Sequence, residues 1–335
     1  MYSKNRIGKI NGKGIFMLIG VDIGGTKCAV LAAEEAACGM CIRERRAFET
    51  AGKTPQEVLA EFDEIIGEYR LSYPDDGIRA VGISCGGPLD SQTGVILSPP
   101  NLPGWDHIEI TRHFTETLGV PARLINDANA SALAEWKYGA GVGTQNMIFL
   151  TFGTGLGAGL VLNGALYEGT NGMAGEVGHM RLAAFGPSGY GKCGSFEGFC
   201  SGTGIAELAR SFAREALQRG EKVGFVPDGD LQKAVITAKS VAAAAYDGDA
   251  AAQKVFRICG EKLGAGLAVL IDLFNPEVIV IGSIFARCQD LLWPYAEPVI
   301  RAEALGRSEA VCRVVPAKLG EKIGDYAALA VAAEA

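Results

Sequence analysis

The sequence has no long apolar run and no surplus of positive charge. No stretch of its 335 residues approaches the roughly 18 apolar residues of a membrane-spanning helix, and the most apolar segment, 267–274, is interrupted by Asp272. Lys and Arg number 31 against 38 Asp and Glu, which leaves a formal net charge of −7. This acidic balance argues against nucleic acid and against an anionic membrane surface as partners.

A regular cysteine pattern is also missing. The nine cysteines are an odd number scattered along a long chain, which favours reduced thiols in a cytoplasmic protein over a disulfide framework. Cys38 and Cys41 form one CxxC without a second pair, and this is more typical of a turn between strands than of a metal site.

The N-terminus lacks the features of a secretory signal. Residues 1–16 hold four basic residues and no acidic one, but only a short apolar stretch follows, without a small-residue cleavage site. We interpret residues 1–16 as a disordered, solvated extension. We expect synthesis to begin at Met17, which opens the first strand.

Glycine, in contrast, is in excess. It supplies 46 of the 335 residues, whereas its usual share is about 7%. The glycines show no G-x-y period and 48% of the residues are hydrophobic, so collagen-like and disordered classes are excluded. A chain of this length is at the limit of one hydrophobic core, which predicts two domains. The glycines indicate tight turns or close backbone approaches, a first hint of phosphate binding.

Two hairpins with glycine-rich turns stand out in the strand pattern. Residues 17–31 and 147–162 each show an apolar β-run, a turn with glycine and threonine, and a second β-run. They lie about 130 residues apart and predict a coarse internal repeat of structure. A capping box at Thr54–Glu57 predicts a helix, and Asn126-Asp127 predicts another that runs to Tyr138. Further helices are expected at 203–219, 240–246, 249–274, 291–304 and 325–335, and strands at 278–281 and 312–315.

The first glycine turn follows a strand that ends in Asp22. Backbone N–H groups and a hydroxyl there can bind an anion, and a Cβ would collide with a phosphate lying against the backbone. Asp22 would repel phosphate unless a cation stood between them, which indicates Mg²⁺ held indirectly by this carboxylate. For an isolated turn, an ordinary hairpin is the simpler interpretation, and the Walker string does not occur. The nucleotide-binding residues expected here are Asp22, Gly24, Gly25, Thr26 and Lys27.

A second glycine turn of the same kind weakens the interpretation of the first as an ordinary hairpin. Alternate glycines over 153–159 leave one strand face bare for a ligand, and Thr154 adds a hydroxyl. Facing each other across a cleft, the two turns would clamp a triphosphate from both sides. The residues expected to bind it are Gly153, Thr154 and Gly155.

The two turns together resemble the phosphate motifs of the actin–hexokinase–Hsp70 superfamily. Further segments narrow this resemblance to the ROK family of bacterial sugar kinases and sugar-responsive repressors: 150–180 (LTFGTGLGAGLVLNGALYEGTNGMAGEVGHM), 82–90 (GISCGGPLD), 100–105 (PNLPGW), 126–135 (NDANASALAE) and 275–282 (NPEVIVIG). The likeness runs from Met17 to the C-terminus. It implies an α/β fold of two ribonuclease-H-like, actin-like ATPase domains with ATP and sugar in a central cleft. The implied domains are 17–134, a smaller one on which 321–335 packs back, and 135–320.

The strand-to-helix junction at Asn126-Asp127 is a place where a side chain can point into a cleft. Asp127 there could act as general base for a hydroxyl that attacks a phosphoryl group, although a plain helix N-cap is the alternative. The resemblance favours Asp127 as the catalytic base. It also implies sugar binding by Gly87, Asn101, Asn126, Asp127, Glu176, His179 and Glu197, and places Gly282 and Ser283 near the adenosine.

The main departure from the family pattern is a zinc loop without its cysteines. Many ROK proteins have three cysteines that bind structural zinc together with an upstream histidine. Ser188, Tyr190 and Ser195 occupy those three positions here, and His179 alone cannot complete a tetrahedral site. We therefore expect no zinc and a loop held by packing of Tyr190 and Phe196 and by hydrogen bonds. A shifted site on Cys193 and Cys200 is the alternative.

These observations predict an ATP-dependent hexose kinase in the cytoplasm, and the family resemblance implies a homodimer or homotetramer. Glucose is the first choice of substrate, phosphorylated at its 6-hydroxyl, with N-acetylmannosamine, N-acetylglucosamine, allose and fructose as alternatives. A sugar-sensing regulator is the rival of another class. Repressors of the family carry an N-terminal helix-turn-helix domain, for which the 16 residues before the first strand are too few.

Overall fold

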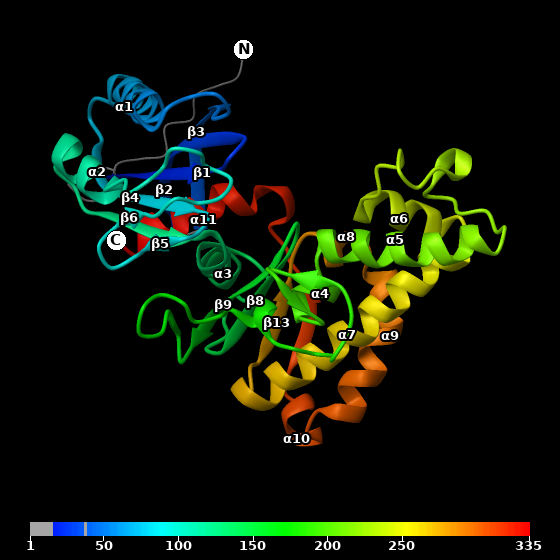
Figure 1. Ribbon diagram of the computed structural model, residues 1–335. Coiled ribbons are helices and arrows are strands. Elements are labelled where there is room, and N and C mark those ends of the chain that lie inside the picture. Colours follow the sequence, from blue (N-terminus) through cyan, green and yellow to red (C-terminus); the bar gives the residue numbers. More distant parts are fainter. Residues whose placement is uncertain (1–15, 37–38) are drawn as a thin grey trace, which may run out of the picture. The chain divides into compact units, whose positions relative to one another are not determined.

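The computed structural model describes residues 16–36 and 39–335, and the chain divides into two compact units. The first unit runs to Ala130 and includes 322–335, and the second is 131–321. Each unit is built around its own five-stranded sheet, so the expected α/β class with two such domains is confirmed (Figure 1). The expected N-terminal extension lies outside the described residues except for Phe16, the first residue of β1.

The sheet of the first unit has the order β3-β2-β1-β4-β7. Its strands are β1 (Phe16–Ile23), β2 (Lys27–Ala36), β3 (Gly39–Glu49), β4 (Gly77–Cys85) and β7 (Ala122–Asn126). The first three pair antiparallel, and β4 and β7 run parallel to β1. Ile23 pairs with Cys85, and Cys85 pairs with Asn126. The three parallel strands therefore end side by side at one edge of the sheet.

The helices of the first unit follow from their caps and apolar spacing. In α1 (Pro55–Ser72) the capping box at its N-terminus is confirmed: Thr54 N–H donates to Glu57 Oε2 at 2.8 Å. The predicted helix after β7 is α3 (Asp127–Tyr138). One helix, α2 (Ile110–Leu118), was not expected from the sequence. It buries Ile110 and Phe114 and ends at Gly119 in the left-handed conformation.

The C-terminal helix α11 (Ile323–Ala333) lies directly on β1 and β4 of the first unit (Figure 1). An added Cβ on Gly82 would come 2.1 Å from Ala332 N, and one on Gly20 would come 3.1 Å from Leu329 Cδ2. The strands thus carry glycine where an alanine-rich helix packs with its backbone against them. This close approach joins the end of the chain to its beginning.

The second sheet repeats the order of the first, as β10-β9-β8-β13-β14. Its strands are β8 (Met147–Phe152), β9 (Leu156–Leu162), β10 (Ala165–Leu166), β13 (Val278–Ile281) and β14 (Arg313–Pro316). Three strands again pair antiparallel, and two follow in parallel. The coarse structural repeat expected from the two hairpins is therefore confirmed.

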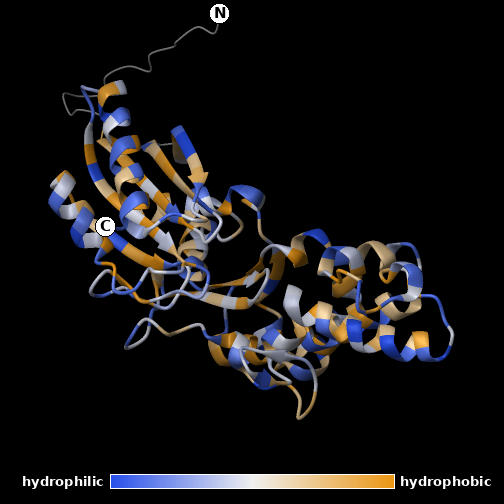
Figure 2. Ribbon diagram, turned by 45° about the horizontal axis from the view of Figure 1, so that its top comes forward, coloured by the Kyte–Doolittle hydropathy of each residue, from blue (hydrophilic) through white to orange (hydrophobic). Residues whose placement is uncertain are grey.

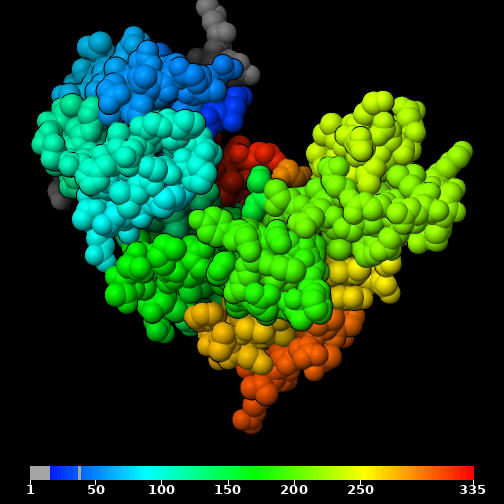
Figure 3. Space-filling model, in the orientation of Figure 1, coloured from blue at the N-terminus to red at the C-terminus, as the bar shows by residue number. Residues whose placement is uncertain are grey.

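Four helices of the second unit begin and end within about two residues of the predicted bounds: α5 (Gly202–Gln218), α6 (Ala238–Tyr246), α7 (Ala250–Phe274) and α9 (Gln289–Glu303). The short helices α4 (Phe196–Phe199), α8 (Ile284–Arg287) and α10 (Gly306–Glu309) were not predicted. The remaining short elements are β5 (Leu89–Asp90), β6 (Val95–Ile96), β11 (Ser188–Gly189), β12 (Lys192–Cys193) and the 3₁₀ turns Val177–His179, Pro227–Gly229 and Gly320–Lys322. In the space-filling view α5 and α6 form a yellow-green lobe of this unit (Figure 3).

Each unit has a separate apolar core. Many residues in the strands of both sheets are hydrophobic, and the ribbon is orange at these residues in Figure 2. In the first unit α1 covers the sheet through Phe62 and Ile66, and in the second α7 does so through Leu263 and Leu267. Within residues 16–36 and 39–335, no helix is long and apolar enough to cross a membrane.

Candidate functional site

Two acidic side chains stand at the edge where the parallel strands of the first unit end. Asp22 is the last but one residue of β1, and Asp127 follows β7 as the first residue of α3. Burial, together with the negative charges of Asp325 and Asp127, raises the pKa of Asp22 to about 6. Asp127 therefore lies close enough to Asp22 for its charge to disfavour ionisation of the Asp22 carboxyl.

The carboxylate of Asp127 combines solvent access with a raised pKa. Its side chain is exposed, yet the protein atoms around the carboxylate displace water and raise its pKa. Hydrogen bonds from the N–H groups of Asp127 and Ala128 lower this pKa in part. The capping of α3 is done by its neighbour, because Asn126 Oδ1 accepts the Asn129 N–H at 2.8 Å. The N-cap and the catalytic candidate are thus two different side chains.

The first glycine turn packs against the loop that holds Asn101. Gly24 N–H donates to the Lys27 carbonyl at 3.1 Å and closes the turn. A Cβ on Gly25 would lie 2.1 Å from Asn101 O, and one on Gly86 would lie 3.8 Å from Asn101 Nδ2. The structure therefore brings together the turn, Asn101 and the loop of Gly86 and Gly87. Thr26 and Lys27 lie in the same turn with exposed side chains.

The start of α11 is a part of this site that the sequence analysis missed. A Cβ on Gly324 would lie 2.8 Å from Asp22 Oδ2, so glycine leaves room for the carboxylate there. Arg45 on β3 donates through Nε to both oxygens of Asp325, at 2.9 Å each. No local signal in the sequence links Arg45 to residues 324–325, because only the packing of α11 on the sheet brings them together.

The second glycine turn presents backbone N–H groups in one direction. Gly202 N–H donates to Gly153 O at 2.7 Å, and Thr203 Oγ1 donates to Thr154 O at 3.0 Å. Because the N–H and C=O of a peptide point in opposite directions, the N–H groups of Thr154 and Gly155 point away from α5. Such a set of parallel donors, without a Cβ on either glycine, fits a phosphate group.

Gly282 and Ser283 follow β13 beside this turn. Gly282 N–H donates to Leu150 O at 2.9 Å and so extends the ladder of β13 with β8. A Cβ on Gly153 would lie 3.8 Å from Ser283 Oγ. Ser283 has a φ of 51°, an unusual value for a residue other than glycine. The expected adenosine residues thus lie next to the second glycine turn.

The expected sugar residues of the second unit lie around that turn as well. Glu197 Oε2 accepts the Leu156 N–H at 3.0 Å, and a Cβ on Gly155 would lie 2.7 Å from the same oxygen. A Cβ on Gly178 would lie 3.3 Å from Glu197 Cβ. Glu176 and His179, which are exposed, flank Gly178 on one 3₁₀ turn. Carboxylates and an imidazole therefore gather where the glycine turn begins β9.

Comparison with known proteins decides the family. The model of the ROK family matches residues 18–335. The chain belongs to the ROK family. A glucokinase of Streptomyces coelicolor is 32% identical over 324 residues, which cover 95% of this chain and 98% of that protein. A xylose repressor of Caldicellulosiruptor bescii is 27% identical over 274 residues, 81% of this chain and 66% of its own length.

A solved structure of the family supports the same assignment. The ROK family glucokinase of Streptomyces griseus, in complex with glucose and AMPPNP, matches with a TM-score of 0.70 and 30% identity. The match covers 95% of this chain and 99% of that one. The family resemblance predicted from the sequence motifs is therefore confirmed.

The loop that corresponds to the zinc loop of other ROK proteins has a different set of contacts. Ser195 Oγ accepts the Gly198 N–H at 3.1 Å as the N-cap of α4, and Cys193 Sγ donates to Gly186 O at 3.0 Å. Lys192 Nζ donates to His179 O at 2.6 Å. Among the described residues, no three His, Cys, Asp or Glu side chains are placed to hold a metal ion. These residues do not fit a zinc ion.

One expectation about this loop was wrong. Phe196 is buried, and an added Cβ on Gly266 of α7 would come 2.3 Å from its ring. Tyr190, in contrast, is 89% exposed and meets the His179 ring edge-on at 6.4 Å. Tyr190 has a φ of 45° at the turn between β11 and β12, which directs its side chain away from the core. Cys200 is buried, and its Sγ donates to Cys259 O.

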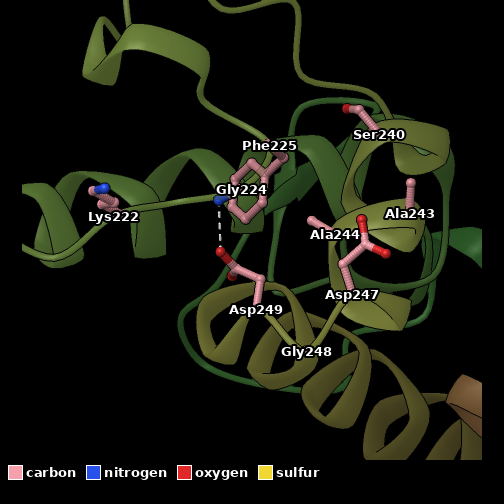
Figure 4. Close-up of a pocket in the computed structure, with 9 residues that line it drawn as sticks. All are labelled: Lys222, Gly224, Phe225, Ser240, Ala243, Ala244, Asp247, Gly248 and Asp249. Atoms are coloured by element: carbon pink, nitrogen blue, oxygen red, sulfur yellow. Dashed lines mark hydrogen bonds between the residues drawn. The ribbon is translucent and has the colours of Figure 1, made fainter.

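A hollow of about 550 Å³ elsewhere in the second unit contains none of the expected site residues (Figure 4). Its polar groups are used for local structure: Asp249 accepts the Gly224 N–H at 2.6 Å and caps α7, and Ser240 completes the capping box of α6. Lys222 and Asp247 at its rim are exposed. The hollow therefore has no converging set of free polar groups of the kind that binds a ligand.

Proposed function

We propose that this ROK protein is an ATP-dependent sugar kinase that phosphorylates the 6-hydroxyl of glucose. The observation that carries the proposal is Asp127, an accessible carboxylate with a raised pKa beside Asp22 at the edge of the first sheet. Glucokinase relatives that match over nearly their whole length support the sugar kinase activity. The AMPPNP and glucose in the Streptomyces griseus structure support ATP and a hexose as its substrates.

In this proposal Asp127 accepts the proton of the sugar hydroxyl as the hydroxyl oxygen attacks the γ-phosphorus of ATP. The new bond is O–P, the bond broken is that between the γ-phosphorus and the bridging oxygen, and ADP leaves. A carboxylate with a raised pKa is a better proton acceptor than an ordinary aspartate, provided that it is ionised at the working pH. Asn126, which caps α3, fixes the start of the helix and with it the position of Asp127.

The two glycine turns bind the phosphates in the proposal. Gly24, Gly25, Thr26 and Lys27 act on one side, and Gly153, Thr154 and Gly155 act on the other. Their N–H groups would donate to the phosphate oxygens and stabilise the negative charge there during the transfer. Gly282 and Ser283, beside the second turn, are proposed to contact the adenosine.

The carboxylate of Asp22 is suited to bind Mg²⁺. It is a partly buried carboxylate next to Asp127 and Asp325, and oxygen donors of this kind suit Mg²⁺, which keeps several waters and bridges to phosphates. Because no three such side chains among the described residues are placed to hold a metal ion directly, Asp22 would hold the ion indirectly. When bound, the ion supplies positive charge that offsets the charge of the phosphates.

The sugar is proposed to be held by paired donors and acceptors. On the second unit these are Glu176, His179 and Glu197, and on the first they are Asn101, Asn126 and the backbone at Gly87. Carboxylates accept from adjacent hydroxyls, and the amides and imidazole add donors. The glucose preference itself is inferred from the glucokinase relatives.

A coupled assay of ADP release with a panel of hexoses tests this function. We expect ATP-dependent release with glucose and slower release with N-acetylmannosamine, N-acetylglucosamine, allose and fructose. Release with none of them, together with sugar binding in calorimetry, would favour a regulator, a class to which the xylose repressor relative belongs. The oligomeric state, predicted as a homodimer or homotetramer, is checked by analytical ultracentrifugation.

A further inference from the structure

One continuous segment holds the second phosphate turn from two sides. It comprises α4 and the first turn of α5, residues 196–203. Its later part binds the turn through Gly202 N–H to Gly153 O at 2.7 Å and Thr203 Oγ1 to Thr154 O at 3.0 Å. Its earlier part binds the turn through Glu197, which accepts the Leu156 N–H at 3.0 Å. The position of the turn therefore depends on this segment.

The side chain of Glu197 is closely fitted into its surroundings. Added Cβ atoms would come 2.8 Å from Glu197 Cβ at Gly189 and 3.3 Å at Gly178, and 2.7 Å from Oε2 at Gly155. Three glycines thus leave room for this half-buried side chain. A displacement of its carboxylate is transmitted to the backbone that it touches.

A carboxylate has two oxygens and about four acceptor sites, of which the Leu156 N–H uses one. The remaining sites of Glu197 are suited to hydroxyl donors, which is what a sugar presents. We infer that Glu197 links the sugar site to the phosphate turn, so that sugar binding orders the turn for ATP. The inference rests on the proposed function, in which Glu197 contacts the sugar.

The physical basis is that sugar binding and ATP binding would both order the same turn. A sugar hydroxyl bound to Glu197 restricts its rotamers, and through the Leu156 N–H it restricts the turn at 153–156 as well. ATP that binds afterwards loses less conformational entropy in ordering that turn. Linkage requires that the nucleotide raise the affinity for sugar by the same factor. The consequence is a phosphate site that is completed when the phosphoryl acceptor is present, which limits transfer to water.

Calorimetry with glucose and AMPPNP measures this link directly. The coupling factor is the ratio of the glucose dissociation constants without and with saturating AMPPNP, and we expect it to be about 5 or more in the wild type. In Glu197→Ala it should fall to about 1. His179→Ala is the matched control, because its ring meets Tyr190 rather than the turn: glucose affinity should fall several-fold while the coupling factor stays.

Two outcomes overturn the inference: a wild-type factor near 1 in an active enzyme, or an unchanged factor in Glu197→Ala. A wild type that neither binds nor phosphorylates any hexose would instead contradict the proposed function. Hydrogen exchange measured on the wild-type protein tests the link without depending on the folding of a variant. Glucose alone should slow exchange in a peptide that covers 153–157, and an effect of glucose confined to other segments would also overturn the link.

Discussion

Arg45 and Asp325, 280 residues apart in the sequence, form an ion pair in which one guanidinium nitrogen lies 2.9 Å from each carboxylate oxygen. The pair ties β3 to the start of α11, where Gly324 leaves room for the Asp22 carboxylate. Burial is the main cause of the raised pKa of Asp22; the charge of Asp325 raises this pKa further and Arg45 lowers it. The ion pair therefore adjusts the pKa of a carboxylate at the proposed phosphate site.

Arg45→Met should move the acid limb of activity to higher pH. Loss of the guanidinium leaves Asp325 unpaired beside Asp22 and raises the pKa of Asp22 above its value of about 6. Since the proposed role of Asp22 requires its ionised form, kcat/KM for ATP should then begin to fall at a higher pH than in the wild type. The measurement is a pH profile from 5 to 9. Arg46→Met is the control, because Arg46 pairs with Glu68 at the surface instead, and its profile should match the wild type.

Asp127→Asn should lower kcat by about 10² to 10⁴, the usual contribution of a general base, while sugar binding stays nearly the same. The amide keeps the size of the side chain but cannot take the proton. Turnover in the coupled assay and glucose binding in calorimetry check the two halves of this expectation. A variant with near-normal turnover would refute Asp127 as the base.

Gly155→Ala should weaken the binding of both substrates. The new methyl group would lie 2.7 Å from Glu197 Oε2, so either the carboxylate or the phosphate turn must move. We expect KM for ATP and for glucose each to rise about tenfold or more, since a displacement of 1 Å at such a site can cost a factor of about 10². Gly67→Ala is the control, because a methyl group there meets nothing within 4 Å and the glycine lies inside α1. An effect on ATP alone would contradict the contact between the turn and Glu197.

Gly82→Ala should destabilise the first unit. Its methyl group would come 2.1 Å from Ala332 N, so α11 would have to move off the sheet. Overpacking of this kind costs about 1–3 kcal/mol in the free energy of unfolding. Urea denaturation measures it, with Gly67→Ala again as the control. If Gly82→Ala is as stable as the wild type, α11 does not pack on β4 as described.

Removal of metal should leave the loop at 181–200 intact. Its contacts are hydrogen bonds such as Lys192 to His179 O and the Ser195 cap of α4, and these residues do not fit zinc. After dialysis against EDTA, the melting temperature should be unchanged and resupplied Mg²⁺ alone should restore full activity. Zinc near one ion per chain, lost together with activity on chelation, would contradict this.

Local sequence determined much of the fold. The capping box at Thr54 and the glycine turns of the two hairpins act over a few residues, so each could be predicted without knowledge of the rest of the chain. The strand Val278–Ile281 was predicted with its observed bounds because a continuous apolar run fits a buried parallel strand. The same local motifs indicated the family and the candidate site residues, whose roles stay predictions.

The contacts between these motifs depended on tertiary structure. The pairing of Arg45 with Asp325, the bond from Leu156 to Glu197 and the exposure of Tyr190 join or separate residues that are distant in the chain. No periodicity encodes such contacts, because they follow from which helix packs on which sheet and from the space that glycines leave between them. The sequence alone thus determined the glycine turns and the acidic residues near them, and packing decided which side chain holds each turn in place.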